Sequence, residues 1–178
     1  MKKLLLLFAA ALMMLSGCDT SKYKTFSVAG LQFDYPKDYK VEIDEADEAE
    51  GVWKVVVYND DNDWNFARMI IFKYEPGELD ELDNDDIMNK LHENCMAICS
   101  NLIDSEEYEI TDMSDLEDST SGELNTWCFF TANCEDVEVT GMVTSSMLDE
   151  YMITSLCQGH EKEDGSNMVH VDSSVRKK

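Results

Sequence analysis

Basic residues are scarce in this chain. Its 178 residues include 14 lysines and arginines against 38 aspartates and glutamates, which gives a formal net charge of −24. This balance excludes nucleic acid as a partner, because binding to a phosphate backbone depends on lysine and arginine contacts. Anionic lipid headgroups would repel the same surface.

Glycine, proline and histidine are also few, with 8, 2 and 3 residues. So little glycine leaves hardly any material for a phosphate-binding loop. The chain contains no Gly-x-Ser-x-Gly, no His-Glu-x-x-His and no Cys-x-x-Cys sequence, and it has no internal repeat or low-complexity segment. Because no catalytic motif is complete, we predict that the protein is not an enzyme and that it uses no cofactor.

The chain begins with a segment that is typical of a secretory signal. Lys2 and Lys3 precede an almost unbroken apolar run, Leu4 to Leu15. A bilayer-spanning helix needs about 20 apolar residues, so this run is too short to span and matches a signal h-region. Leu15-Ser16-Gly17-Cys18 closes the run and resembles the lipobox of bacterial lipoproteins. The resemblance implies cleavage before Cys18, acylation of that cysteine, and an extracytoplasmic position on a bacterial membrane.

We therefore divide the chain into a signal peptide (residues 1–17), a lipidated tether (18–25) and a single domain (26–178). Without residues 1–17, which hold two lysines and no acid, 12 basic and 38 acidic residues remain, a balance of −26. We expect the acyl anchor alone to hold the protein at the membrane. The acidity either keeps the domain soluble and away from an anionic surface, or it forms a docking face for cations or a basic partner.

Strand patterns recur along the expected domain. Alternating apolar residues predict strands at about 31–35, 41–43, 52–58, 64–74, 124–133, 137–146 and 151–158. The segment 64–74 is apolar on both faces, which is typical of a central strand that is covered on both sides. The stretch from Asp104 to Gly122 is polar and is predicted to be a connection.

The strongest helix signal spans Asp83 to Ile103. Asp83 or Asn84 can cap its start, and the acidic first turn suits the positive end of the helix dipole. One apolar stripe at helical spacing contains Ile87, Leu91, Cys95, Ile98 and Leu102. We expect this stripe to pack on the sheet. A second, short helix is predicted from Ser166 onward.

This order of elements predicts an α+β fold: an α-β-α sandwich with an antiparallel sheet of about six to seven strands, one long helix and a short C-terminal helix. The segment Phe33-Asp34-Tyr35-Pro36 with Tyr39, and Val171-x-x-Ser174-Val175 near the end, make residues 26–178 similar to the PsbP-like group. That group includes the extrinsic photosystem II subunit PsbP and bacterial lipoproteins. The resemblance implies a domain that binds partners and is generally not an enzyme, and it implies no catalytic residues.

His92, Cys95 and Cys99 are the one set of side chains suited to a metal. On a helix they project from neighbouring positions on one side, and imidazole and thiolate are ligands for Zn²⁺ or Cu⁺. The competing interpretation is structural, because Cys95 lies in the apolar stripe and cysteine is commonly buried as a small hydrophobe. We favour the structural interpretation and predict no metal site.

Disulfide pairing stays open. Besides Cys18, the cysteines are Cys95, Cys99, Cys128, Cys134 and Cys157. This odd number allows at most two disulfides and leaves one thiol over. Cys95 and Cys99 are poor partners for each other, since helical Cβ atoms four residues apart lie about 5–6 Å apart and a disulfide needs about 3.5–4.5 Å. A bridge from the helix to Cys128 or Cys157 is geometrically easier.

These features favour a membrane-anchored, extracytoplasmic, non-catalytic binding or assembly lipoprotein with a protein partner. One alternative is a lipid-anchored carrier or sensor of a small ligand or cation, and a less favoured one is a thiol-based enzyme. A carrier would need a deep pocket with convergent polar groups, and an assembly protein an exposed apolar patch.

The acidic clusters at 60–63 and 83–86 are interpreted as a turn and a helix cap. A Ca²⁺ loop starting at Asp61 would have Phe66 and Phe72 where glycine and glutamate are required.

Overall fold

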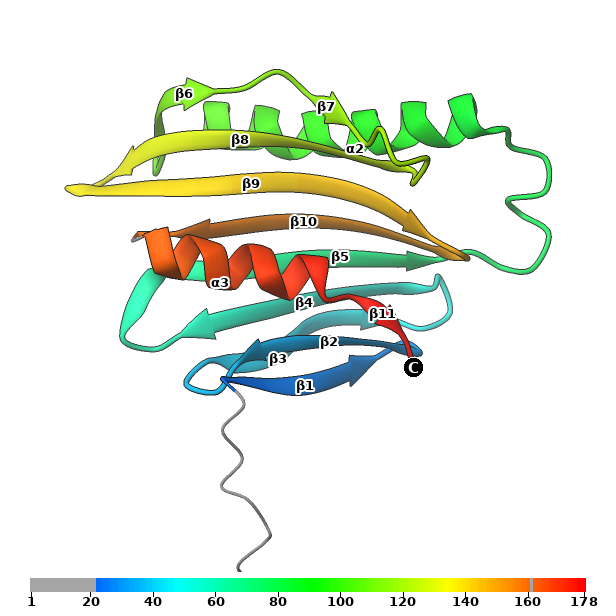
Figure 1. Cartoon of the computed structure of the whole chain (residues 1–178), viewed down its shortest axis with the longest axis horizontal. Helices are drawn as coiled ribbons and strands as arrows, with labels where there is room; N and C mark the ends of the chain where they lie inside the picture. Colours follow the sequence, from blue (N-terminus) through cyan, green and yellow to red (C-terminus); the bar gives the residue numbers. More distant parts are fainter. Residues whose placement is uncertain (1–21, 161) are drawn as a thin grey trace, which may run out of the picture.

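In the residues that the structure describes, secondary structure begins close to the start of the expected domain. A computed structural model describes residues 22–160 and 162–178, so the signal segment, Cys18 and half of the tether lie outside the described residues. The first strand starts at Tyr23, ahead of the expected domain start at residue 26. With the labels of Figure 1, the elements are β1 Tyr23–Val28, β2 Leu31–Pro36, β3 Lys40–Asp47, β4 Val52–Asn59, β5 Asn62–Lys73, α2 Asn84–Asp104, β6 Glu109–Met113, β7 Glu117–Asp118, β8 Asn125–Cys134, β9 Val137–Leu148, β10 Tyr151–Gly159, α3 Lys162–Ser173 and β11 Arg176–Lys177.

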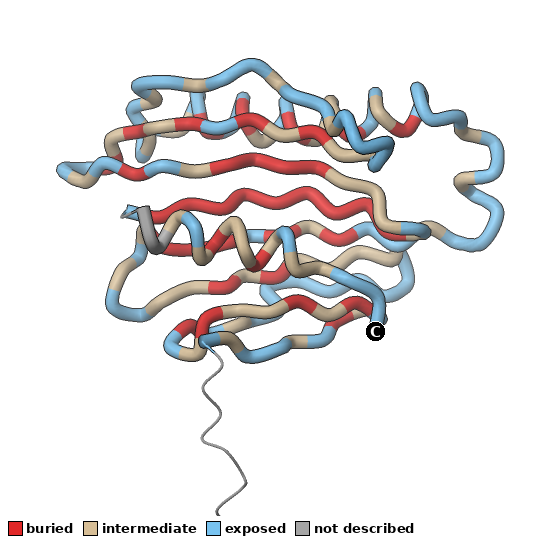
Figure 2. Tube along the Cα trace, in the orientation of Figure 1, coloured by how far each residue is buried: buried red, intermediate tan, exposed pale blue. Residues whose placement is uncertain are grey.

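One large antiparallel sheet organises the fold. Its eight strands run in the order β3-β4-β5-β10-β9-β8-β6, with β7 also paired to β8. All nine residues of β10 are buried, because this strand lies at the centre of the sheet and is covered on both faces. Figure 2 shows this buried band along β10 and β9, and the more exposed strands on either side. A second sheet of three strands combines the hairpin β1-β2 with β11 at the C-terminus.

The two helices cover opposite faces of the large sheet. α2 packs on β8, β9 and β10, whereas α3 packs on β10 and β5 and against β2 of the small sheet (Figure 1). Successive residues of a strand point to opposite faces. On β10, Ile153 and Cys157 therefore lie in the core under α3, and Leu156 lies in the core under α2. The predicted α-β-α sandwich is present, and the small sheet is an addition to its α3 layer.

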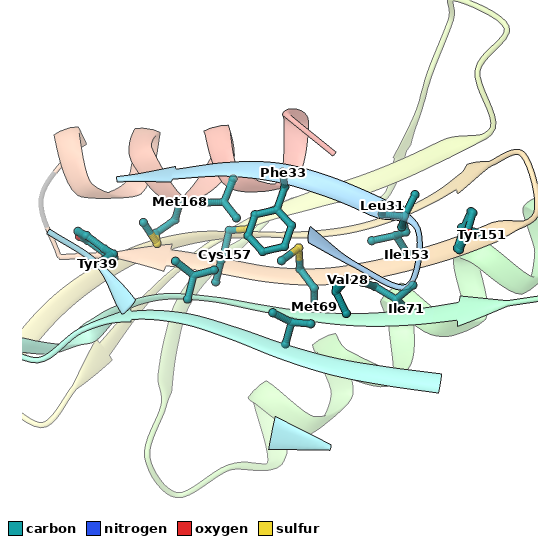
Figure 3. Packing of buried hydrophobic residues seen from close by; sticks show 14 residues of the cluster. Val28, Leu31, Phe33, Tyr39, Met69, Ile71, Tyr151, Ile153, Cys157 and Met168 are labelled. Atoms are coloured by element: carbon teal, nitrogen blue, oxygen red, sulfur yellow. The ribbon is translucent and has the colours of Figure 1, made fainter. Parts of the chain in front are cut away.

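The core under α3 joins both sheets to the C-terminal helix. Phe33 of β2, Met69 of β5, Cys157 of β10 and Met168 of α3 meet there and are almost completely buried (Figure 3). Burying a large apolar side chain contributes roughly 1.5–3 kcal/mol. This cluster therefore attaches the hairpin and α3 to one face of the large sheet.

Local signals determine where α2 begins and which side it buries. The Asp83 side chain accepts a hydrogen bond from the backbone of Asp86, and the Asp86 carboxylate accepts one from the backbone of Asp83. This reciprocal cap satisfies N–H groups that lack a partner within the helix. The buried stripe comprises Ile87, Leu91, Cys95, Cys99 and Leu102. Cys99 thus takes the place expected for Ile98, which is only half-buried. None of the helices in the described part of the chain is long and apolar enough to cross a membrane.

The large sheet exceeds the six to seven strands that the sequence predicts. β6 and β7 come from the stretch 104–122, which was expected to be a connection, and both pair along the edge of β8. Their side chains are mostly exposed, so they lack the apolar alternation that marks a covered strand. β11 is only two residues long and forms by pairing with β2. These strands depend on a partner strand rather than on their own sequence pattern.

Candidate functional site

A groove lies beside α2, on the face of the large sheet that this helix covers only in part. α2 packs on β8, β9 and β10, and the groove opens next to it over β5 and β4. Its volume is about 800 Å³, within the range of about 300–1,000 Å³ that is usual for ligand pockets. A second hollow, beside Tyr74 and Met152, is smaller, at about 160 Å³.

Three strands in register form the floor of the groove. Val56 of β4 lies opposite Arg68 of β5, and Arg68 lies opposite Leu156 of β10. Ile70 and Phe66, two residues away on either side of Arg68, belong to the same face and also line the groove. The guanidinium carbon of Arg68 lies 4.7 Å from the centroid of the Phe66 ring, an arrangement that cation–π attraction stabilises. The floor is therefore mostly apolar, with a cation at its centre and the polar residues Lys54 and Thr154 on either side of Ile70.

The wall and one end of the groove are held by packing and hydrogen bonds. α2 supplies the wall through Ile98 and Leu102. At the end, the rings of Trp64 and Tyr108 meet edge to face with centroids 6.2 Å apart. The Tyr108 hydroxyl donates to Oε1 of Gln158 over 2.8 Å, and the Gln158 amide donates to the Trp64 carbonyl over 3.1 Å. Burial raises the pKa of Tyr108 to about 12, so its hydroxyl keeps its proton at neutral pH.

Acidic side chains dominate the border of the groove. Arg68 and Lys54 are the cations of the lining, and Lys54 is already paired with Glu45. Among the residues that the structure describes, no carboxylate lies within ion-pair distance of Arg68. The exposed acids at the border are Asp44, Asp63, Glu106, Glu107 and Glu135. The groove thus combines an apolar interior with an excess of negative charge around it.

The structure does not bring His92, Cys95 and Cys99 together as a ligand set. Nε2 of His92 lies 2.7 Å from Oδ1 of Asp118, and this hydrogen bond lowers the pKa of Asp118. Cys95 and Cys99 lie on the buried side of α2, and burial raises the pKa of Cys95 to about 12. Within the described residues, no group of three His, Cys, Asp or Glu side chains could hold a metal ion.

The five cysteines of the described chain are all buried free thiols. Sγ of Cys99 lies 3.2 Å from Sγ of Cys128. Cys134 lies in the same core under α2, and Cys157 lies in the core on the opposite face. A buried thiol with a raised pKa is a poor nucleophile, because the thiolate is the reactive form.

The sequence singled out no residue of the groove as a binding residue, and Trp64 was expected to pack in the core rather than to line a groove. Strand 64–74 was expected to be covered on both faces, but the face with Arg68 and Ile70 opens into the groove. Arg68 was the available signal for an open face. A charged side chain at the centre of an apolar strand face is rarely fully buried, so a face that carries one is not expected to be completely covered.

The fold, with two helices on opposite faces of an antiparallel sheet, is PsbP-like. Among solved structures, the chain is similar to the cyanobacterial PsbP protein, CyanoP, from Synechocystis, with a TM-score of 0.52 and 14% identity over 92% of this chain and 96% of that one. A crystal structure from Bacteroides thetaiotaomicron matches with a TM-score of 0.46 and 12% identity, over 89% of this chain and 49% of that one. No family model and no curated protein matches the sequence. Likeness at this level of identity shows the fold alone.

Proposed function

We propose that this chain is a non-catalytic, extracytoplasmic binding module, attached to a bacterial membrane through a lipid on Cys18. Its groove beside α2 receives a basic, amphipathic segment of a partner protein. The observation that carries the proposal is the groove, an apolar space of about 800 Å³ with an acidic border. The PsbP-like fold supports the non-catalytic part of the proposal, and the lipobox supports the extracytoplasmic part.

The apolar side chains of the partner would fill the space between α2 and β5. Val56, Ile70 and Ile98 line this space and are only half-buried in the isolated chain. Covering them stabilises a complex by roughly 25 cal/mol for each Å² of apolar surface removed from water. An amphipathic helix presents apolar residues at i, i+3, i+4 and i+7 and commonly docks in such a groove. Its apolar stripe would lie along the floor.

The basic side chains of the same segment would face the acidic border. Complementary charge speeds association and discriminates against acidic partners. The border acids are exposed, so this attraction should weaken as the Debye length falls from about 10 Å at 0.1 M salt to about 3 Å at 1 M. The guanidinium of Arg68, stacked on Phe66, has donors left for carbonyl oxygens of the segment. The charge of the chain as a whole, −24, favours the same class of partner.

A synthetic peptide tests this proposal on residues 22–178. The probe is an amphipathic helix of leucine and lysine, and the control is a leucine–glutamate helix of equal length. Trp64 lies at the end of the groove, so its fluorescence reports occupancy once Trp53 and Trp127 are replaced by phenylalanine. We expect saturable binding of the lysine peptide alone. Equal binding of both peptides would contradict the role of charge, and binding of neither would contradict the groove as a docking site.

A matched pair of variants locates the binding. Ile98→Lys places a cation in the wall of the groove, whereas Met96→Lys places the same charge at a position of α2 that is 54% exposed. Ile98→Lys should weaken binding at least about tenfold, which corresponds to about 1.4 kcal/mol, and Met96→Lys less than about threefold. Ile98 packs in part on the core under α2, so Ile98→Lys should lower the melting temperature more than Met96→Lys, and binding is compared at a temperature at which both variants are folded. Equal losses would show that general attraction to an acidic protein, and not the groove, explains the binding.

A further inference from the structure

Two sulfur atoms are in contact where α2 packs on β8. Sγ of Cys99 lies 3.2 Å from Sγ of Cys128, and both residues are almost completely buried. Cys95, one helical turn earlier, instead donates to the carbonyl oxygen of Thr126 over 3.8 Å. The helix thus places one cysteine over a backbone carbonyl and the next over a second cysteine.

This contact follows from the matching steps of the helix and the strand. Four residues of an α-helix rise about 6 Å, and two residues of a strand advance about 6.6 Å. From Cys95 to Cys99, α2 therefore advances nearly as far as β8 does from Thr126 to Cys128. Cys134 lies six residues further along β8, about 20 Å away, and is out of reach of Cys99. Cys157 belongs to the core on the other face of the sheet.

We propose that Cys99 and Cys128 are the disulfide-forming pair of this chain. A sulfur–sulfur bond is about 2.05 Å long, so the two sulfurs approach by about 1.2 Å from their separation of 3.2 Å when the bond forms. With this one bridge, the other three cysteines, Cys95, Cys134 and Cys157, remain as buried thiols. Formation in the cell rests on the extracytoplasmic location of the proposed function, since disulfides persist in oxidising compartments.

The oxidant is the disulfide of a thiol oxidoreductase or of glutathione, written RS–SR. The thiolate of one cysteine attacks RS–SR, forms a mixed disulfide and releases RS⁻. The thiolate of the second cysteine then attacks the protein sulfur of the mixed disulfide, forms the Cys99–Cys128 bond and releases the second RS⁻. The two protons lost by the cysteines convert both RS⁻ to RSH, and the two electrons lost by the cysteines reduce RS–SR.

The exchange takes place before α2 closes over β8. In the folded chain both thiols are inaccessible, and the hydrogen bond to Cys128 together with burial raises the pKa of Cys99 far above its usual value. Because an oxidant cannot reach either buried sulfur, the folded, reduced pair reacts slowly. During folding, by contrast, both sulfurs are exposed to the oxidant.

The bridge clamps the wall of the groove to the sheet. Cys99 lies between Ile98 and Leu102 on α2, and both of these residues line the groove. The bonded residues are 29 positions apart, and the loop between them contains β6 and β7. Closing a loop of this length restricts the unfolded chain, and the expected rise in Tm is on the order of 10 °C.

The test determines the disulfide content of the full chain, expressed with its own N-terminal segment and isolated from cells. Free thiols are blocked with a maleimide in denaturant, and unreduced peptides are sequenced by mass spectrometry. A protease that cuts at glutamate or aromatic residues is needed, because no lysine or arginine lies between Lys90 and Lys162. A second sample is reduced, unfolded and refolded in a glutathione redox buffer. We expect a Cys99–Cys128 cross-linked peptide in both samples, with the other thiols blocked.

The two samples distinguish an error in the Cys99–Cys128 pairing from an error in the extracytoplasmic location. A bridge that forms only on refolding supports the pair and contradicts the extracytoplasmic part of the proposed function. Free thiols at both positions in both samples, or a bridge between a different pair, refutes the proposal. As an independent measure, a reductant should lower the Tm of the wild type and of Cys95→Ala by on the order of 10 °C and leave that of Cys99→Ala unchanged. A wild-type Tm that does not respond to the reductant refutes the bridge even if Cys99→Ala fails to fold.

Discussion

Replacing Gly141 of β9 by alanine should destabilise the fold, although this change often stabilises a protein. Gly141 lies opposite Phe130 of β8 and Gln158 of β10. A Cβ atom at this position would overlap the Phe130 ring and lie 2.8 Å from the carbonyl oxygen of Cys157. Phe130 is only 3% exposed and packs in the core under α2, so its ring can move only by displacing its neighbours. The side chain of Phe130 occupies the volume that glycine leaves open.

Two opposing effects determine how much Gly141→Ala changes the free energy of unfolding. Alanine restricts the unfolded chain more than glycine does, which by itself stabilises a protein by about 0.4–1 kcal/mol. Extra volume in a filled core costs about 1–3 kcal/mol. We therefore expect Gly141→Ala to lower the free energy of unfolding by about 1–2 kcal/mol and the Tm by about 2–8 °C.

Urea denaturation followed by tryptophan fluorescence measures the effect. Gly165→Ala is the matched control, because a Cβ at that position of α3 would meet only the Thr140 hydroxyl at 3.5 Å. Alanine in a helix should there stabilise by about 0.5–1 kcal/mol. Phe130→Leu should make Gly141→Ala less costly by giving the new methyl group room. The proposed packing is wrong if Gly141→Ala is as stable as the wild type or more stable.

Three further predictions concern α2, the C-terminus and the anchor. Leu91→Ala empties a fully buried position and should cost about 2–5 kcal/mol in urea denaturation, whereas Met96→Ala should cost less than about 0.5 kcal/mol; equal costs would contradict the buried stripe. Arg176→Gln removes the hydrogen bonds that lower the pKa of Asp34. A lowered carboxylate pKa stabilises the fold only above the pKa of the unfolded chain, so this variant should be less stable than wild type at about pH 6 and approach it at about pH 2; a gap independent of pH would contradict this. Cys18→Ala should leave an uncleaved precursor that incorporates no labelled palmitate, and normal labelling would exclude the lipobox.

The long helix could be predicted because its signals lie within one element. The cap at Asp83 and the spacing of Ile87, Leu91 and Leu102 depend only on helical geometry. The central strands could be predicted for the same reason, since burial imposes an apolar pattern on residues such as Ile153 and Leu156. β6, β7 and β11 escaped prediction because pairing with an existing edge stabilises them, and pairing of this kind leaves little trace in composition.

The groove could not be predicted because it depends on how far α2 extends over the sheet. That extent is set by packing between the helix and three strands, and no single segment records it. Arg68 was the local clue, as a cation within an apolar strand face. The contact between Cys99 and Cys128 was one of several open pairings, and only the register between α2 and β8 singles it out.

The most direct measurement is a map of backbone amide chemical shifts in residues 22–178 during titration with the leucine–lysine peptide. If the groove is the binding site, the shifts that change will lie on β4, β5 and the second half of α2, with Val56, Ile70 and Leu102 among the largest. Phe129, which is 50% exposed on β8, should stay unchanged. Changes centred on Phe129, or spread evenly over the acidic surface, would contradict a binding site in the groove.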